Sequence, residues 1–465
     1  MAKTPTGKYP SGKILLGTRA ERYEAGRRLR KKTPREKHAE LSGPDDRDPV
    51  AILATSDRDR VPQLIPVRYQ RMLESPFTFL RGAALVMAED LKHQPSPGIA
   101  VQACGDCHLM NFGAFATPED NMLFDINDFD ETLPGVDFTV DLKRLAASVA
   151  VAALAANFSK KRARAAAAQT VEAYRTRIRS LAKLSPLEVW HSRIELQYEV
   201  EHVEDPTLRR QLHAIITKAG KRLQVDDNFP HLVGAGKEAR IADKPPTIYH
   251  FTDGGDAKNK VDPERVFAFY KKTLTPERLC LFEQYVLKDV AFKAVGVGSV
   301  GTFCAIGLFL SPDGAPLFLQ FKQASKSVLE GLGPPYRHHC GRRVVEGQRT
   351  MQAASDVFLG WTEDEGSQRQ FYVRQLKNRR LGSIAEVVEE NALGHYAQLC
   401  GRTLARAHAR SSDATVLAGY MGKSGAFDDA LASFAMAYTA RNASDYDKLA
   451  KAKKGTKKKG VEQSP

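Results

Sequence analysis

The fold of this chain is decided by residues 294–322, AVGVGSVGTFCAIGLFLSPDGAPLFLQFK. Its glycines fit the pattern G-x-G-x-x-G at Gly296, Gly298 and Gly301. By itself this pattern suits either a phosphate-binding loop or a glycine-tolerant turn, and a dinucleotide-binding fold would need a helix directly after it. Here strand-forming residues follow at 302–306, and after the turn at 311–314 a second apolar run ends at Lys322. The stretch therefore predicts strand, glycine loop, strand, turn and strand.

This order of elements is typical of the small lobe of a protein kinase. In that lobe the loop backbone, here with Ser299 between its glycines, covers the phosphates of ATP, and a strand lysine pairs with the α- and β-phosphates. A helix acid must hold the lysine, and we expect Glu346 to do so because GLGPP at 331–335 ends any helix that carries Glu330. The alternatives are that Lys322 is a solvated lysine on an edge strand and that Glu346 is a plain surface residue.

A second group of polar residues precedes the glycine loop in the chain, in the stretch CGDCHLMNFG at 104–113. Asp106 and Asn111 are five residues apart in a loop after a predicted strand, which is the spacing of a kinase catalytic loop. In such a loop the aspartate accepts the proton of the substrate hydroxyl and the asparagine holds a metal ion. His108 lies between them and is expected to order the loop or to contact substrate or phosphate.

The next predicted strand leads into Asn127-Asp128-Phe129-Asp130. This segment has the position and type of the metal-binding Asp-Phe-Gly element of kinases, with Asp130 in place of glycine. Carboxylate and amide oxygens suit Mg²⁺, so the candidate metal ligands are Asn111, Asp128 and Asp130. Taken singly, each acid could be a turn or helix-cap residue. Together with the glycine loop and Lys322, they predict a site for phosphoryl transfer from ATP.

These motifs resemble those of known families. GDCHLMNFG and FDINDFDE are similar to the G-D-x-H-x-x-N and I-D-F-D elements of aminoglycoside and choline phosphotransferases. More blocks resemble a bacterial family known as domain of unknown function 2252, among them RYQRMLESPFTFLRGAA, NDFDETLPGVDFTVDLKRLAAS and VVEGQRTMQAASDVFLGW. The phosphotransferase resemblance implies a kinase-like fold that uses ATP and Mg²⁺, whereas the bacterial family implies no reaction.

In ordinary kinases the small lobe comes first in the chain, but here it follows the catalytic loop. We therefore predict an α+β, two-lobed protein-kinase-like fold that is circularly permuted, with a helical insertion, which is tolerable because domain termini often lie close together. The expected segments are a basic N-terminal arm (1–60), the catalytic-loop large lobe (61–190), a helical insertion (191–285), the glycine-loop small lobe (286–380), the remaining helices of the large lobe (381–446) and a disordered lysine-rich tail (447–465).

The composition is that of a globular protein, with 42% hydrophobic and 27% charged residues among 465. The N-terminus lacks an apolar leader, no apolar run is long enough to cross a membrane, and six cysteines give no disulfide density, so we expect a cytoplasmic protein. The 69 Lys and Arg residues outnumber the 55 Asp and Glu residues, which gives a net charge of +14 with basic clusters at 27–37 and 451–459. Solvated chain ends explain these clusters most simply, and attraction to a polyanion such as nucleic acid is the alternative.

The sequence thus predicts an enzyme that moves a phosphoryl group from ATP to a hydroxyl of an unidentified small molecule or protein. Three alternatives stay open: transfer of AMP instead of a phosphoryl group, a nucleotide-binding pseudokinase that acts as a scaffold, and a basic nucleic-acid-associated protein in which the acids are incidental.

Overall fold

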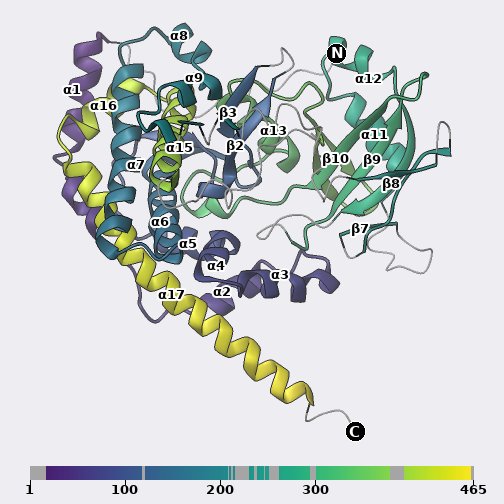
Figure 1. Ribbon diagram of the computed structural model, residues 1–465, viewed down its shortest axis with the longest axis horizontal. Helices are drawn as coiled ribbons and strands as arrows, with labels where there is room; N and C mark the ends of the chain where they lie inside the picture. The colour runs from purple at the N-terminus through teal and green to yellow at the C-terminus, as the bar shows by residue number, and fades with distance from the viewer. Residues whose placement is uncertain are drawn as a thin grey trace.

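The computed structural model describes residues 17–117, 121–207, 209–210, 213–214, 230–234, 238–245, 247–250, 261–293, 300–376 and 392–461. Within these residues the chain is a mixed α+β protein, which confirms the predicted class at this level. Figure 1 shows long helices gathered on one side of the molecule and the largest sheet on the other. No helix in the described ranges is both long and apolar enough to cross a membrane.

The largest sheet has six strands in the order β11-β12-β10-β9-β8-β7, and all neighbours are antiparallel. Its strands are β7 (Ile248–Tyr249), β8 (Val286–Lys293), β9 (Cys304–Leu310), β10 (Pro316–Gln323), β11 (Gly360–Asp364) and β12 (Arg369–Gln375). Strands β9 and β10 form the predicted hairpin, because the turn at 311–314 joins two apolar runs. Residues 294–299 of the glycine loop lie outside the described residues.

Side chains alternate along β10, so Leu319 and Phe321 face one side of the sheet and Lys322 faces the other. Leu319 and Phe321 belong to an aromatic-rich core together with residues of α11 (Pro263–Lys271) and α12 (Pro276–Phe282). Strand β10 pairs with β9 on one side and β12 on the other. Because the side chain of Lys322 is only 3% exposed on this central strand, it is not a solvated edge-strand lysine.

The region predicted as a helical insertion is mixed in the part that the structure describes. It begins where α8 (Pro186–His191) ends and contains α9 (Leu196–Glu201), α11 and α12, but also a hairpin of β5 (Leu232–Val233) and β6 (Arg240–Ile241). Strand β7 of the same region extends the largest sheet by pairing with Phe292 and Lys293 of β8. The helical prediction missed these short strands; in β7, an isoleucine and a tyrosine suit the edge of a half-buried sheet.

The helical side of the molecule is built around α6 (Thr139–Ala155), of which nearly every residue is buried. Around it pack α7 (Lys160–Leu181), α15 (Ala392–Ala409) and α17 (Ala426–Val461). A Cβ added to Gly401 of α15 would lie 2.3 Å from the Thr170 carbonyl oxygen of α7. Helices α7 and α15 therefore meet backbone to backbone, where no larger residue fits.

The N-terminal segments contribute further helices to this side. The basic arm contains α1 (Arg19–Leu29), which begins at a Thr18 capping box and packs on α16 (Ala414–Met421). Three short helices follow, α3 (Ile65–Met72), α4 (Pro76–Gly82) and α5 (Ala84–Leu91). They are separate because Ser75 caps α4 with Pro76 at its first position, and because helical geometry is lost at Ala83.

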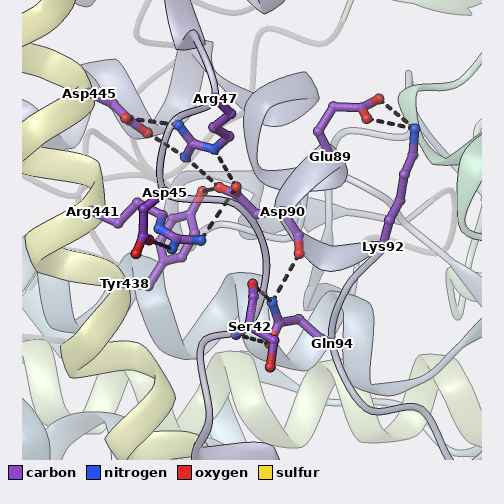
Figure 2. Close-up of polar contacts among 10 residues, drawn as sticks. All are labelled: Ser42, Asp45, Arg47, Glu89, Asp90, Lys92, Gln94, Tyr438, Arg441 and Asp445. Atoms are coloured by element: carbon purple, nitrogen blue, oxygen red, sulfur yellow. Dashed lines mark hydrogen bonds and ion pairs between the residues drawn. The ribbon is translucent and has the colours of Figure 1, made fainter.

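A buried ion-pair network joins α17 to the N-terminal segments (Figure 2). Arg47 donates to both carboxylate oxygens of Asp90 on α5 and of Asp445 on α17, with Nη2 2.6 Å from Asp90 Oδ2 and 2.7 Å from Asp445 Oδ2. The Tyr438 hydroxyl donates to Asp90, and Arg441 lies 3.6 Å from the same carboxylate. Burial alone would lower the pKa of Arg47, but the bonds to its two carboxylates raise it.

The lysine-rich segment expected to be a disordered tail continues α17, which ends at Val461 and runs away from the body of the molecule (Figure 1). Leu449 is fully buried, and Lys453 Nζ lies 3.6 Å from the centre of the Tyr69 ring on α3. These contacts, together with the high helix propensity of alanine and lysine, carry the helix past the predicted boundary.

Candidate functional site

Two short sheets carry the acid-bearing loops. Strand β1 (Ala100–Ala103) pairs with β4 (Leu133–Asp137), and β2 (Phe112–Ala116) forms a hairpin with β3 (Met122–Ile126). The loop with Asp106 follows β1, and the loop with Asp128 and Asp130 follows β3, as the sequence indicated. The Asn127 N–H donates to the Asn111 carbonyl oxygen at 2.8 Å, so the ends of both loops lie side by side.

Hydrogen bonds to Asp141 of α6 fix the Asp106 loop in place. Asp141 accepts the backbone N–H groups of Cys104 at 2.7 Å and of Gly105 at 3.0 Å, and it also contacts His408 Nε2 at 3.1 Å. Gly105 has a φ of +93°, and a Cβ there would lie 2.4 Å from the Glu131 carbonyl oxygen, so only glycine suits this turn. The two thiols of Cys104 and Cys107 lie within 4.8 Å of Asp141. Burial raises the pKa of both thiols, which keeps them protonated and inert.

Asp106 is held by a buried arginine that the sequence did not single out. Arg144 on α6 contacts Asp106 Oδ1 through Nε at 2.6 Å and through Nη2 at 2.5 Å. Nη2 also donates to the Leu80 carbonyl oxygen at 2.9 Å, which fixes the guanidinium in place. Burial raises the pKa of Asp106, and Arg144 opposes that rise only in part. The second oxygen, Oδ2, lies 3.6 Å from His108 Nε2.

His108, next to Asp106 in the site, is buried. Its Nδ1 accepts the Met110 N–H at 3.2 Å, and the Asn111 side-chain amide donates to the Asp106 carbonyl oxygen at 2.6 Å. Burial lowers the pKa of His108 well below its usual value, so its imidazole is neutral. His108 and Asn111 therefore both order the loop, and the Asn111 side-chain oxygen stays available as a ligand.

The structure brings Lys322 to the acid loop. Its Nζ contacts Asp130 Oδ2 although 192 residues of chain separate the two. The hydroxyl of Tyr372, the cross-strand neighbour of Lys322, donates to Asp130 Oδ1 at 2.8 Å. Burial would raise the pKa of Asp130, but Lys322, Tyr372 and Arg374 together lower it. Burial would lower the pKa of Lys322, and the charge of Asp130 acts against burial and raises it.

Asp128 differs from Asp130 in that no cation contacts it directly among the residues with described contacts. Its Oδ1 accepts the Asp130 N–H at 3.2 Å. Burial and the neighbouring Asp130 raise the pKa of Asp128, because both disfavour a second negative charge at this place. A partly buried carboxylate beside a second one, with Asn111 in the adjoining loop, is a donor set that fits Mg²⁺. Asp130 fits less well as a ligand, since Lys322 and Tyr372 occupy its oxygens.

A second basic residue, Arg374, lies on the lysine side of the sheet. On β12 it is paired in register with Gln320 of β10, and its Nε donates to the Gln320 side chain at 3.0 Å. Its Nη1 donates to the Asn127 carbonyl oxygen at 3.3 Å, directly before Asp128. Two cations from the sheet, Lys322 and Arg374, thus face two acids of the loop.

Glu346, which we expected to hold Lys322, has other partners. It accepts from Arg342 Nε at 2.7 Å within α13 (Cys340–Met351) and from the Tyr336 hydroxyl at 3.3 Å. The residue of α13 that reaches the acid loop is Arg343, which donates to the backbone carbonyl groups of Asp130, Thr132 and Ser325. The acid that pairs with Lys322 in this structure is therefore Asp130, because α13 presents an arginine to the loop.

The glycine loop is described only at its end. Gly296, Gly298 and Ser299 lie outside the described residues. Gly301 has a φ of +94°, and its carbonyl oxygen accepts the Val61 N–H at 2.7 Å. The neighbouring Val300 carbonyl oxygen accepts from Arg60 Nη1 at 2.5 Å. The end of the loop is thus anchored to the segment before α3.

The sequence contains only weak signals for the site residues that its patterns did not identify. Arg144 stands in the apolar run DLKRLAAS, where a basic residue inside a buried helix requires a partner. Tyr372 and Arg374 are two positions apart on a strand and so point to the same face. Neither signal indicates which acid is the partner.

Lys143, next to Arg144 on α6, gives a prediction about stability. Its Nζ lies 5.0 Å from the Phe434 ring and has no hydrogen-bond partner in the described part of the chain. Burial lowers its pKa to about 7, against a smaller opposing effect of Asp137. Between this pH and the pKa of an unfolded lysine, roughly 10.4, the unfolded chain binds more protons, so folding stability rises with pH.

We therefore expect Lys143→Met to raise the free energy of unfolding at pH 7, and we expect this gain to shrink by pH 9.5. Urea denaturation of both proteins at the two pH values measures it. Lys183→Met, at an exposed position, is the matched control and should change little at either pH. An equal gain in unfolding free energy at both pH values would contradict the lowered pKa of Lys143.

The fold and the site define a mixed α+β protein in which a buried lysine of the largest sheet meets acid-bearing loops of the helical part. Residues 60–452 match the family described as an uncharacterized protein conserved in bacteria (DUF2252), and the chain belongs to this family. The resemblance seen in the sequence is thereby confirmed for the family. No curated protein and no solved structure matches the chain.

Proposed function

We propose that the protein is an ATP- and Mg²⁺-dependent phosphotransferase of a circularly permuted, kinase-like type. The observation that carries this proposal is the contact between Lys322 and Asp130 across 192 residues of chain. It joins β10, the second strand after the glycine loop, to the loop that holds Asp128. Charge interactions among Asp106, Asp128 and Asp130 support a single site formed by both loops.

The order of elements on the sheet side also supports the proposal. The glycine loop lies between β8 and β9, the lysine is on β10, and α13 comes next, followed by β11 and β12. This is the order of the small lobe of a kinase. Because these elements follow the acid loops in the chain, we propose a permuted arrangement.

In this proposal each residue has a role that its surroundings favour. Lys322 and the glycine loop would bind the phosphates of ATP, while Asp128 and the side-chain oxygen of Asn111 would hold Mg²⁺. When bound, Mg²⁺ offsets negative charge on the β- and γ-phosphates. Arg374 adds positive charge beside Asp128, and Asp130 positions Lys322.

Asp106 would receive the acceptor. Because Arg144 occupies Oδ1, Oδ2 is the oxygen that can take a proton from an acceptor hydroxyl. The hydroxyl oxygen bonds to the γ-phosphorus while the bond to the bridging oxygen breaks, and ADP leaves with the electron pair. The hydroxyl proton passes to Asp106, whose raised pKa favours its acceptance.

A label-transfer assay tests this function. The wild-type protein is incubated with Mg²⁺ and ATP labelled at either the γ- or the α-phosphate, together with a panel of hydroxyl compounds and with the protein alone. We expect the γ-label to move to an acceptor and the α-label to stay in ADP. Movement of the α-label would overturn phosphoryl transfer in favour of AMP transfer, and no movement of either label would overturn the proposed enzyme.

A further inference from the structure

Arg343 of α13 is a buried charged residue to which the proposed reaction gives no role. It is 2% exposed, and its guanidinium donates to three backbone carbonyl groups. Nη2 lies 2.8 Å from both the Asp130 and the Ser325 carbonyl oxygens, and Nη1 donates to the Thr132 carbonyl oxygen. Asp130 and Thr132 belong to the acid loop between β3 and β4, whereas Ser325 follows β10, the strand of Lys322. One guanidinium thus joins the acid loop to the segment after the lysine strand.

Two further hydrogen bonds join the same segments. The Ser327 hydroxyl donates to the Glu131 carbonyl oxygen at 2.6 Å, and the Val328 N–H donates to Glu131 Oε2 at 2.8 Å. The Gly105 turn packs against the same Glu131 carbonyl group, so the Asp106 loop also borders these contacts. The position of the sheet relative to the two acid-bearing loops is therefore set in part by the contacts around Arg343.

Helix α13 packs tightly on both of the parts that Arg343 joins. A Cβ added to Gly341 would lie 2.1 Å from the Phe371 carbonyl oxygen of β12, and one added to Gly347 would lie 2.4 Å from Thr132 Cγ2. No larger residue fits at either place, so the helix lies directly against the sheet at its first turn and against the acid loop further along. Arg343 lies between these two contacts. A shift of α13 relative to the sheet would therefore move the acid loop with it.

Packing alone does not require an arginine at this position. A buried charge is costly, and an apolar side chain of similar volume often stabilises a core as well or better. An apolar side chain cannot, however, donate to carbonyl groups of two separate segments at once. The proposed site needs this link, because Lys322 of the sheet and Asp128 of the acid loop must reach the same phosphates and Mg²⁺. A displacement of about 1 Å in such a site is costly.

We propose that Arg343 is a positioning residue of the nucleotide site, which holds the acid loop at the distance from Lys322 at which both bind one Mg²⁺·ATP. This inference rests on the proposed function, because it assumes that the nucleotide lies between Lys322 and Asp128. Arg343 acts through the backbone of the acid loop and of Ser325, and it does not itself contact the nucleotide in this arrangement.

The test compares Arg343→Gln and Arg343→Lys with wild type and with Arg175→Met. Arg175 is the matched control, because it is also buried and pairs with Asp428 of α17, outside the proposed site. Calorimetry measures the affinity for ATP with Mg²⁺, and label transfer measures the rate at saturating ATP. Hydrogen–deuterium exchange without nucleotide follows the amides of 125–132 and 324–330, and thermal unfolding gives the stability of each protein.

We expect Arg343→Gln to exchange faster in both segments and to bind Mg²⁺·ATP at least about 10-fold more weakly, because charge-assisted bonds that fix the acid loop are lost. The transfer rate at saturating ATP should stay within about 2-fold of wild type, since Arg144 and not Arg343 holds Asp106. Arg343→Lys should fall between the two, because it keeps the charge and part of the donors. Arg175→Met should lose stability but keep the ATP affinity of the wild type.

Equal ATP affinity in wild type and Arg343→Gln would overturn the inference and leave the proposed function standing. An equal weakening of ATP binding in Arg175→Met would overturn it too, because lost stability would then explain both results. If Arg343→Gln does not fold, Arg343→Lys gives the answer, and wild-type affinity in that variant overturns the inference. A folded wild-type protein that does not bind ATP would contradict the proposed function and the inference together.

Discussion

Replacing Asp106 with Asn should lower the rate of group transfer about 10³-fold while leaving the affinity for Mg²⁺ and ATP unchanged. The amide oxygen of Asn can still accept from Arg144, so the loop should keep its shape. What the variant lacks is a carboxylate that can take the proton of the acceptor. The loss should therefore appear in the chemical step and not in nucleotide binding.

The label-transfer assay and calorimetric titration with ATP measure the two effects separately. Asp59→Asn, the same change at an exposed position, serves as the control and should behave as the wild type in both measurements. If Asp106→Asn lost ATP binding together with transfer, Asp106 would be a residue of the nucleotide site, and its assignment as the proton acceptor would fail.

The largest loss of stability should come from Arg47→Met. The side chains of Asp90 and Asp445 are 2% and 3% exposed, and Arg47 is the residue that binds both (Figure 2). Removing one partner of a buried ion pair leaves an uncompensated charge, which costs about 3–5 kcal/mol. Arg441 lies near Asp90 and should offset part of this cost. The expected loss of unfolding free energy is therefore at the lower end of this range.

Arg27→Met is the matched control, because Arg27 pairs with Glu24 on an exposed face of α1. An exposed pair of this kind contributes about 0.5 kcal/mol or less. Urea denaturation at pH 7 should therefore separate the two variants clearly. A loss in Arg47→Met no larger than in Arg27→Met would show that the network does not hold α17 in place.

Local sequence patterns predicted the parts of the site that lie within one loop or strand. The five-residue spacing of Asp106 and Asn111 lies in a loop directly after β1, and the turn at 311–314 joins β9 to β10. Such features depend on neighbouring residues, since turn chemistry and side-chain alternation act over a few positions.

The partners of these residues could not be predicted, because they depend on how distant elements pack. Lys322 pairs with Asp130 and not with Glu346, since α13 turns Arg343 toward the acid loop. Arg144 contacts Asp106 only because α6 packs against the Asp106 loop. For the same reason the lysine-rich end of the chain did not indicate that it continues α17, with Leu449 and Lys453 packed against the N-terminal helices.

We claim above all that the glycine loop, Lys322 of β10 and the acid loops form one nucleotide site. Calorimetric titration of ATP, with and without Mg²⁺, into wild type, Asp128→Asn and Asp59→Asn tests it most directly. We predict that wild type and Asp59→Asn bind ATP only with Mg²⁺, and that Asp128→Asn binds at least about 10-fold more weakly because a metal ligand is lost. No binding of ATP by the folded wild-type protein, or equal Mg²⁺-dependent binding by all three proteins, would contradict it.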